Sequence, residues 1–354
     1  MTKILKVDPI NPEPEVLSEA VATLASGGLV AFPTETVYGL GADVFNSDAV
    51  SKVFKVKGRP ADNPLIVHVD SLQMLDEVVE EVPDNVLHVL KRAWPGPLTV
   101  ILRKKPTVPN VVTAGLPAVA VRCPAHPVAL ALIKGLGRPV AAPSANLSGK
   151  PSPTTAEHVI NDLYGKVDVI IDGGDTFFGV ESTVINVLTD PPTLLRPGPI
   201  GLEELTKLFG KDINVPQHIR GFSEAEVALS PGMKYRHYAP EKPLVLIELS
   251  DYGDLSKLVN EVLTVVNELT SSGFKVAVIG SDETLSYYTD AVKLSLGSRK
   301  NLYEVAKNLF KVLRNVDRLD VDVAVVEGFE EKGIGLAIMN RLRKAATRKL
   351  IKTY

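Results

Sequence analysis

Short polar clusters follow apolar runs in the N-terminal half of the sequence, and their residue types suit the binding of a charged ligand. The first cluster, residues 33–40 (Pro-Thr-Glu-Thr-Val-Tyr-Gly-Leu), places small hydroxyl groups and a glycine at the end of an apolar run. Open α/β sheets bind ligands at the carboxyl ends of their strands, so this segment is a candidate ligand site. The alternative is a turn in which the hydroxyl groups cap the backbone.

The second cluster is basic and covers residues 55–60. Lys55, Lys57 and Arg59 lie close together, with a glycine between the last two. A lysine acts as a point charge and an arginine as a bidentate fork, so together they can neutralise a polyphosphate. The alternative is a solvated helix end, where basic side chains interact with the helix dipole. His68 follows in an apolar run and can equally be a packed histidine of a strand.

Two further clusters combine small polar residues with glycine. Residues 143–149 (Pro-Ser-Ala-Asn-Leu-Ser-Gly) form a loop suited to binding a phosphate or an amide, or else a plain polar loop. Ser182 could bind a substrate or merely begin a strand, and Arg196 could hold a phosphate or lie on the surface. The sequence contains neither a Walker motif nor a Gly-x-Gly-x-x-Gly motif, so it does not indicate a P-loop ATPase or a dinucleotide enzyme.

Composition narrows the class of protein further. The chain has 354 residues, enough for two domains, and 45% hydrophobic with 23% charged residues is typical of globular proteins. The net charge of −3 argues against a protein that binds nucleic acid over its whole surface. Cys123 is the only cysteine, which excludes an internal disulfide. We find no signal peptide and no apolar run of about 20 residues, so we expect a cytoplasmic protein without a membrane partner.

The elements that must position these clusters are short apolar strands and amphipathic helices. The strand candidates of the first half are Gly28–Val37, Pro64–Val69, Leu98–Arg103, Ala118–Arg122, Pro139–Pro143, Val167–Asp172 and Thr183–Leu188. The helix candidates are Ser47–Val56, Thr154–Tyr164 and Leu202–Phe209. Some neighbouring strands have no helix between them, so the sequence predicts an α/β domain with a twisted mixed sheet over residues 1–210.

Residues 211–242 are interrupted by proline and glycine and are predicted to form a linker. Residues 243–354 then alternate regularly, which predicts a smaller Rossmann-like domain with a parallel sheet. Its strand candidates are Leu244–Leu249, Lys275–Ile279, Val292–Leu296 and Val321–Val326, and its helix candidates are Leu255–Leu269, Thr284–Tyr288, Leu302–Leu313 and Leu336–Ile351. The tail from Lys332 to Lys352 is basic and could contact RNA, but we interpret it as an ordinary, exposed basic face of the last helix.

Taken together and in this order, the motifs resemble those of the YrdC family, the threonylcarbamoyl-AMP synthases, over about residues 15 to 210. The resemblance rests on the clusters above and on Asn-Pro-Leu-Ile-Val-His, Trp94-Pro95-Gly96-Pro97-Leu98-Thr99, Arg122, Ser182-Thr183-Val184 and Arg196-Pro197-Gly198. Residues 230–240 (Ser-Pro-Gly-Met-Lys-Tyr-Arg-His-Tyr-Ala-Pro) resemble the linker motif of the longer members, which carry an additional Rossmann-like domain.

The resemblance implies an enzyme, a nucleotidyltransferase that joins L-threonine, bicarbonate and ATP into threonylcarbamoyl-AMP and releases pyrophosphate. The product serves to modify the adenosine beside the anticodon of tRNA, which makes tRNA or the threonylcarbamoyl-transferase complex a further partner. ATP would bring Mg²⁺ with it, and no protein side chain is expected to bind the metal. No catalytic nucleophile or base is obligatory, because positioning alone can lower a barrier by about 7–11 kcal/mol.

The resemblance also assigns roles to single residues. Lys57, Arg59 and Arg196 would position and neutralise the phosphates. The expected threonine pocket consists of Thr34, His68, Arg122 and Ser182. The expected nucleotide site consists of Lys57, Arg59, Thr113, Ser144, Asn146, Arg196 and, from the linker, Lys234, Tyr235 and His237.

Two other interpretations remain open from the residues alone. A cationic cleft could bind the backbone of double-stranded RNA or tRNA without catalysis. The net acidic charge and the low aromatic content of 6% argue against this interpretation. Related domains also occur within a hydrogenase-maturation protein that transfers carbamoyl groups, but that larger protein carries zinc fingers, whereas this chain has a single cysteine.

Overall fold

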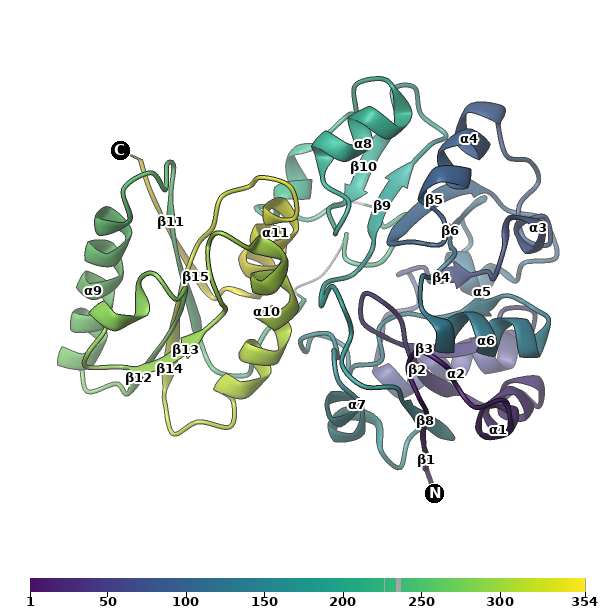
Figure 1. The fold of residues 1–354 in the computed structure, drawn as a ribbon, viewed down its shortest axis with the longest axis horizontal. Helices are drawn as coiled ribbons and strands as arrows, with labels where there is room; N and C mark the ends of the chain where they lie inside the picture. Colours follow the sequence, from purple (N-terminus) through teal and green to yellow (C-terminus); the bar gives the residue numbers. More distant parts are fainter. Residues whose placement is uncertain (226, 234–236, 354) are drawn as a thin grey trace.

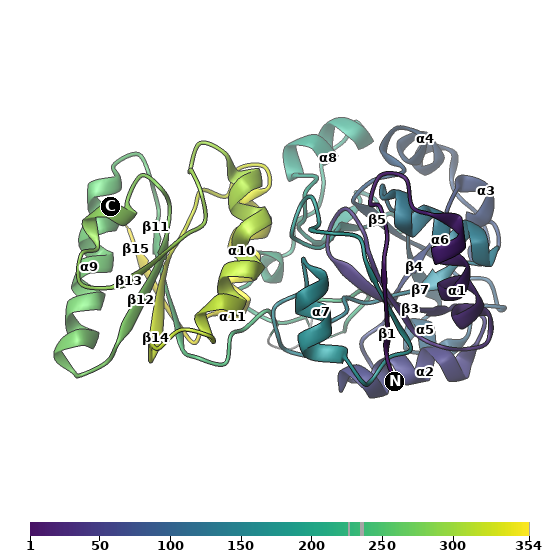
Figure 2. The same cartoon turned by 60° about the horizontal axis from the view of Figure 1, so that its bottom comes forward.

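Two β-sheets lie side by side with helices between and around them, as the computed structural model of residues 1–225, 227–233 and 237–353 shows (Figure 1). The larger sheet belongs to the N-terminal half and the smaller one to the C-terminal half. Both views place the C-terminal sheet to one side of the molecule, with α10 (Leu302–Val316) and α11 (Gly335–Ala345) facing the N-terminal half (Figure 2). None of the described helices is long and apolar enough to cross a membrane.

The N-terminal sheet has ten strands in the order β1-β8-β2-β3-β7-β4-β6-β5-β9-β10. The strands are β1 (Lys3–Lys6), β2 (Val30–Pro33), β3 (Tyr38–Asp43), β4 (Ile66–His68), β5 (Leu98–Arg103), β6 (Ala118–Arg122), β7 (Val140–Ala141), β8 (Val169–Asp172), β9 (Thr183–Asn186) and β10 (Thr193–Arg196). The sheet contains both parallel pairs, such as β4–β6, and antiparallel pairs, such as β5–β6. The prediction of a mixed sheet is therefore confirmed.

Eight described helices pack around this sheet and connect its strands. They are α1 (Pro14–Ala25), α2 (Ser47–Lys57), α3 (Leu72–Leu75), α4 (Asp84–Ala93), α5 (Asn110–Thr113), α6 (Pro127–Leu136), α7 (Ala156–Leu163) and α8 (Leu202–Phe209). The side chain of Asn46 caps the start of α2 by accepting from the backbone of Ala49. Gly58, with a φ of 67°, ends α2 in the left-handed conformation, so Arg59 leaves the helix in a new direction.

The C-terminal sheet has five parallel strands in the order β13-β12-β14-β11-β15. They are β11 (Leu244–Leu249), β12 (Val276–Gly280), β13 (Val292–Ser295), β14 (Val323–Glu327) and β15 (Arg348–Lys352). Apolar residues of α9 (Leu255–Ser271) cover one face, while α10 and α11 cover the other. The core on the α10–α11 face also includes Val37, Val180 and Tyr238, so it extends into the loops of the N-terminal half. The parallel α/β prediction for this half is confirmed.

The structure also corrects the sequence-based elements. All seven strand candidates of the first half are present in shortened or equal form, but β1, β3 and β10 were not predicted. Strand β3 contains two glycines, which weaken a strand pattern. At Gly41 a β-carbon would lie 2.8 Å from the side chains of Phe32 and Val140, so close packing between strands requires glycine there.

The predicted helix over Leu336–Ile351 is wrong in its second part. Helix α11 ends at Ala345, and Arg348–Lys352 forms β15, which pairs in parallel with β11. The exposed basic face is wrong as well, because Arg341 and Arg343 of α11 are buried. Long-range pairing with β11 and buried carboxylate partners decide both points, and neither is visible in local sequence.

Candidate active site

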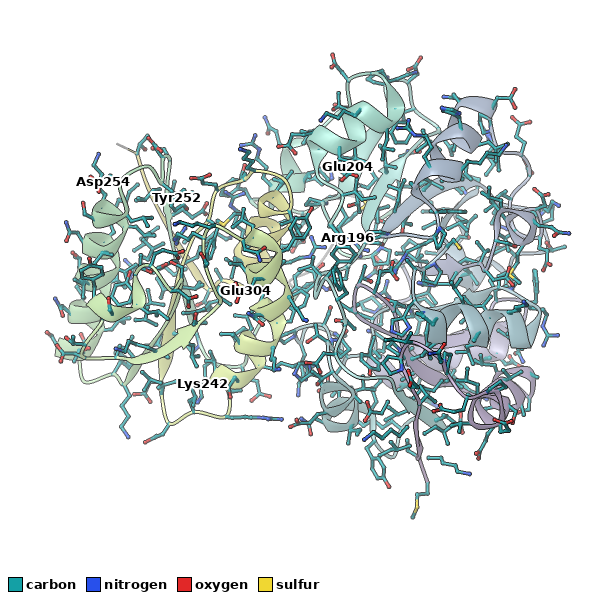
Figure 3. The ribbon with its side chains drawn as sticks, viewed as in Figure 1. Arg196, Glu204, Lys242, Tyr252, Asp254 and Glu304 are labelled. Carbon is teal, nitrogen blue, oxygen red and sulfur yellow. The ribbon has the colours of Figure 1, made fainter. Side chains whose placement is uncertain are left out.

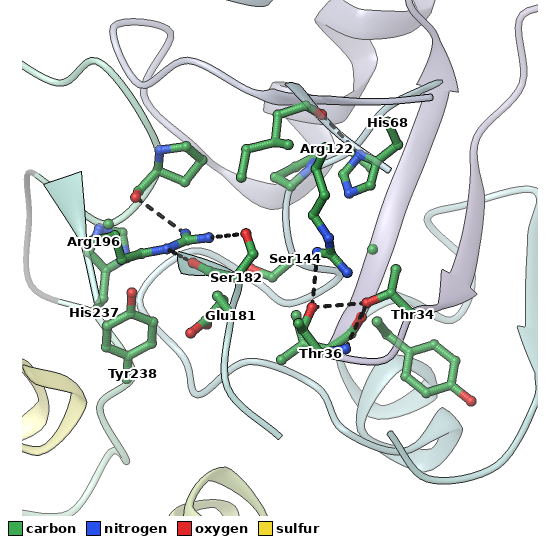
Figure 4. Close-up of a pocket in the computed structure, with 18 of the residues that line it drawn as sticks. Thr34, Thr36, His68, Arg122, Ser144, Glu181, Ser182, Arg196, His237 and Tyr238 are labelled. Carbon is green, nitrogen blue, oxygen red and sulfur yellow. Dashed lines mark hydrogen bonds between the residues drawn. The ribbon is translucent and has the colours of Figure 1, made fainter. Parts of the chain in front are cut away.

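Loops at the ends of several strands of the N-terminal sheet, together with Pro231, Gly232, His237 and Tyr238, surround one cavity that is partly open to solvent. Figure 4 shows Thr34, His68 and Arg122 on one side of the cavity, and Ser182, Arg196 and Tyr238 on the other. Arg196 lies toward the middle of the molecule, near α10 and α11 (Figure 3).

The turn after β2 serves two purposes at once. The Thr34 hydroxyl donates to the carbonyl oxygen of Val37 at 2.7 Å and accepts from the backbone of Thr36 at 3.1 Å. These bonds make Thr34 a turn-capping residue, as in the alternative interpretation of residues 33–40 from the sequence. The same residue lines the cavity, so the turn also presents hydroxyl groups to a ligand.

Arg122, at the end of β6, is held by partners from this turn. Its Nη2 donates to Oε1 of Glu35 at 2.6 Å and its Nη1 to the hydroxyl of Thr36 at 3.1 Å. Both Arg122 and Glu35 are buried. Nε of Arg122 has no hydrogen-bond partner among the described residues. A buried donor without a partner is costly, so this atom is suited to an anionic ligand such as a carboxylate. The sequence alone assigned no role to Glu35.

His68 is neutral in this environment. Burial, followed by the nearby charge of Arg122, lowers the pKa of His68 to about 3. Its Nδ1 lies 3.1 Å from the carbonyl oxygen of Ile66, an arrangement that requires the proton on Nδ1. The backbone of Val140 is a second hydrogen-bonding neighbour of the ring, and the ring rests edge-on against Phe32.

The opposite side of the cavity carries an excess of positive charge. Arg59 donates to the carbonyl oxygens of Asn63 and Pro64. Arg196 donates to the carbonyl oxygen of Ser182 at 3.0 Å and to its hydroxyl at 3.1 Å. Burial, and next the charge of Arg196, lowers the pKa of Arg59 to about 9.

Lys57 extends this positive region. Its ammonium group donates to the carbonyl oxygen of Ser144, and burial and then Arg59 lower its pKa well below the usual value. Burial likewise lowers the pKa of Arg196 to about 10. Within residues 1–225, 227–233 and 237–353, no ion pair joins Lys57, Arg59 or Arg196 to a carboxylate. Buried cations without carboxylate partners favour the binding of an anion.

The structure places most, but not all, of the predicted residues on the cavity. Thr34, Arg59, His68, Arg122, Ser144, Ser182, Arg196 and His237 line it. Lys57, Thr113 and Asn146 lie outside its lining and are buried. Oγ1 of Thr113 and Oδ1 of Asn146 have no hydrogen-bond partner in the part of the chain that the structure describes. Lys234 and Tyr235 fall outside the described residues.

Tyr238 and Glu181 also line the cavity and were not predicted. Tyr238 is buried, stacks on Phe310 of α10 with ring centres 5.3 Å apart, and has the unusual φ of 65°. At Gly232, which has a φ of 84°, a β-carbon would lie 2.8 Å from the hydroxyl of Tyr238, so this crossing of the linker requires glycine. The linker motif contained Tyr238, but only packing against α10 distinguishes it from its neighbours.

The fold and the cavity together define a class of protein. A mixed α/β domain with a cationic cavity, followed by a parallel domain, is a two-domain nucleotide- or anion-binding architecture. The Sua5–YciO–YrdC family model, described as "Telomere recombination", matches residues 22–198, and the model described as "Threonylcarbamoyl-AMP synthase, C-terminal domain" matches residues 200–347. The chain belongs to the Sua5–YciO–YrdC family.

Relatives of known name cover nearly the whole chain. The threonylcarbamoyl-AMP synthase of Pyrococcus abyssi is 51% identical over 94% of this chain and 94% of its own length. That of Bacillus subtilis is 45% identical over 98% of this chain and 97% of its own length. The crystal structure of P. abyssi Sua5 complexed with L-threonine matches with a TM-score of 0.93 and 47% identity, covering 99% of this chain and 100% of that chain.

Proposed function

We propose that the chain is an L-threonylcarbamoyladenylate synthase, a nucleotidyltransferase that makes threonylcarbamoyl-AMP from L-threonine, bicarbonate and ATP. The observation that carries the proposal is the buried Arg59–Arg196 region without a carboxylate partner among the described residues, which faces Arg122 across one cavity. The Arg59–Arg196 side suits a polyphosphate, and the Arg122 side suits an amino acid. The names of the P. abyssi and B. subtilis relatives support the same activity.

The reaction needs no redox step and no covalent enzyme intermediate. The amino nitrogen of threonine forms a bond to the carbon of bicarbonate, and water and a proton leave, which gives a carbamate. A carbamate oxygen then attacks the α-phosphorus of ATP, and the bond from this phosphorus to pyrophosphate breaks. The protein has to hold the two substrates in line and keep the labile carbamate from water.

The threonine end of the proposed site combines one cation with small polar groups. Arg122, oriented by Glu35 and Thr36, would pair with the threonine carboxylate through its unpartnered edge. Neutral His68 lines the same side and would contact the amino or hydroxyl group of threonine. The hydroxyls of Thr34 and Ser182 line the same space. The complex of P. abyssi Sua5 with L-threonine supports an amino-acid site in this fold.

The nucleotide end of the proposed site would use the cationic residues. Arg59 and Arg196 lie on the cavity, and Lys57 is joined to the loop of Ser144. We infer that phosphate oxygens restore the pKa values that burial lowers, because a nearby negative charge favours the charged form. Asn146, Thr113, His237, Lys234 and Tyr235 remain proposed nucleotide contacts.

Mg²⁺ would reach the site bound to the triphosphate. The lining of the cavity is mainly cationic and hydroxylic, and the carboxylate of Glu181 in this lining is paired with Arg341. The described residues contain no group of three carboxylate, histidine or cysteine side chains that could hold a metal ion. This donor set fits a metal carried by the substrate rather than by protein ligands. When bound, Mg²⁺ would neutralise charge on the phosphates.

We further propose a division of labour along the chain. Residues 1–210 would carry the catalytic domain, residues 211–242 a linker that covers the cavity, and residues 243–354 the supporting Rossmann-like domain. The product would pass in the cytoplasm to the complex that modifies tRNA at the adenosine beside the anticodon. Bicarbonate, tRNA and this complex enter as partners that the reaction chemistry requires.

The test is pyrophosphate release from ATP in the presence of Mg²⁺ and bicarbonate, with and without L-threonine. Release that requires threonine and is weak with serine is the expected result. Folded protein free of bound product that releases no pyrophosphate with any amino acid would overturn the proposal. Salt-dependent binding of duplex RNA by such inactive protein would then favour the RNA-binding interpretation.

A further inference from the structure

An ion pair connects Arg314 of α10 to the buried carboxylate of Asp162 on α7, and this carboxylate in turn holds the loop of residues 143–149. Arg314 donates from Nη1 and Nη2 to the two carboxylate oxygens of Asp162 at 3.0 and 2.9 Å. The same carboxylate accepts from the backbone nitrogen of Leu147 at 3.0 Å, inside that loop. Arg314 also donates to the carbonyl oxygen of Pro151. One arginine of the C-terminal half therefore supports the loop that contains Ser144 and Asn146.

A second buried pair connects α11 to the loop that precedes β9. Arg341 is fully buried and donates from Nε to Oε2 of Glu181 at 2.8 Å. Its other nitrogens donate to the carbonyl oxygens of Glu181 and Pro197. Ser152 donates to the remaining carboxylate oxygen. Glu181 lines the cavity and is followed by Ser182, the residue that contacts Arg196.

An exposed ion pair in the same contact region provides a contrast. Arg318 lies one turn after Arg314, just beyond the end of α10, and pairs with Glu157 of α7 at 2.8 Å. Both side chains are more than half exposed, at 56% and 66%. Glu157 belongs to α7 as Asp162 does, but among the described residues only Asp162 accepts a hydrogen bond from the 143–149 loop. Exposed pairs contribute little to stability, so Arg318 is a matched reference for Arg314.

Both buried carboxylates interact electrostatically with Lys57, which lies behind the cavity, and Glu181 also interacts with Arg196 on the cavity. Burial and then Arg59 lower the pKa of Lys57, whereas Asp162 and Glu181 act in the opposite direction. Glu181 acts in the same way on Arg196. Without an arginine partner, each carboxylate would be available to these cations and would compete with phosphate for them.

We propose that Arg314 and Arg341 are positioning residues for the nucleotide. Each takes up the charge of one carboxylate beside the cavity, so the loops at 143–149 and 179–184 stay in place and the cations remain available to phosphate. This inference rests on the proposed function and assigns the C-terminal half a part in it. In this proposal the C-terminal domain holds the loops around the active site in position and makes no contact with the substrates.

The first experiment compares Arg314→Met with Arg318→Met in the full-length chain. For R314M we expect the KM for ATP to rise about tenfold, while the KM for threonine stays within about twofold, because only the 143–149 loop loses its support. For R318M we expect no change in either constant. Equal values for the two variants would overturn the proposal. If R314M does not fold, R314K replaces it, since lysine keeps the charge without the bidentate fork.

The second experiment tests the charge argument at Glu181. Arg341→Met should raise the KM for ATP about tenfold, because it releases the Glu181 carboxylate to Arg196. Adding E181Q removes the competing charge and the unpaired buried carboxylate, so the double variant should recover to within about threefold of the wild type. Thermal unfolding checks that each variant is folded. A folded double variant no better than R341M would contradict the charge argument.

Binding of ATP by calorimetry separates this inference from the proposed function. Wild-type protein that binds ATP but releases no pyrophosphate would count against the function alone, and the variants would then be compared by their ATP dissociation constants. Wild-type protein that is active, with R314M and R341M unchanged in ATP affinity, would count against the positioning role alone.

Discussion

Two buried polar centres of the molecule use similar residues in opposite ways. At the carboxyl end of β14, Glu327 is fully buried and accepts from the hydroxyls of Thr284 and Tyr288 at 2.5 Å each and from Arg299 at 2.8 Å. In the N-terminal cavity, Arg59 and Arg196 are buried without a carboxylate partner among the described residues.

The contrast separates a structural centre from a binding site. A satisfied polar network stabilises one conformation, whereas buried cations without counter-charges are costly until an anion arrives. The parallel sheet of the C-terminal half has the edge at which such folds commonly bind ligands, yet Glu327 at this edge is occupied by protein groups. The position of the candidate active site is therefore indicated by buried charged groups without a partner, and not by the type of fold.

The largest expected effect on stability concerns the structural centre. Arg299→Met should lower the free energy of unfolding by about 3 kcal/mol, because it leaves Glu327 buried with its charge unpaired. Chemical denaturation measures the loss, and Lys300→Met at the exposed neighbouring position is the control. A loss no greater than that of K300M would remove the distinction between the two centres.

The next effect concerns the threonine side of the cavity. Arg122→Ala should raise the KM for threonine about a hundredfold, since a charge-assisted contact with a carboxylate is lost. Arg103→Ala, at the exposed end of neighbouring β5, should leave this constant unchanged. Threonine dependence of pyrophosphate release measures both. An unchanged requirement for threonine in R122A would refute the assignment of Arg122.

A smaller effect is expected at Arg59, on the cationic side of the cavity, and it tests whether this arginine binds ATP or stabilises the fold. Arg59→Met should weaken ATP binding about tenfold but change the free energy of unfolding by no more than about 1 kcal/mol, because the lost hydrogen bonds are offset by removal of a buried charge. Lys55→Met, exposed on the same stretch of α2, serves as the control. A stability loss as large as that of R299M would show that Arg59 is structural.

The effect that is smallest at neutral pH is a pH dependence of stability. The pKa of His68 is about 3 when folded, below its ordinary value of 6.5, so the unfolded chain binds more protons between these pH values. The contribution of neutral His68 is therefore fully present above about pH 6.5 and is lost as the pH falls toward 3. His68→Gln should make the acid side of the stability curve shallower, and exposed His88→Gln should not. If stability depended on pH with the same slope in both variants, the lowered pKa of His68 would be contradicted.

Local sequence was sufficient for most of the fold. The mixed and parallel sheets follow from the spacing of apolar runs, and Leu98–Arg103, Leu202–Phe209 and Leu244–Leu249 were located to the residue. Strands β1 and β15 escaped prediction because short edge strands with charged residues depend on partners far along the chain, Lys3–Lys6 on β8 and Arg348–Lys352 on β11.

The candidate site divides in the same way. The residue types and the order of the motifs by themselves determined the family, the cationic and hydroxylic character of the site, and eight of the described residues that line the cavity, since these depend on chemistry carried by contiguous segments. Only the tertiary structure decided which charges remain unpaired. Glu35 pairs with Arg122, and Glu181 pairs with Arg341 from a distant helix. Ion pairing depends on distances of a few ångströms between residues separated by long stretches of chain, and local sequence does not contain these distances.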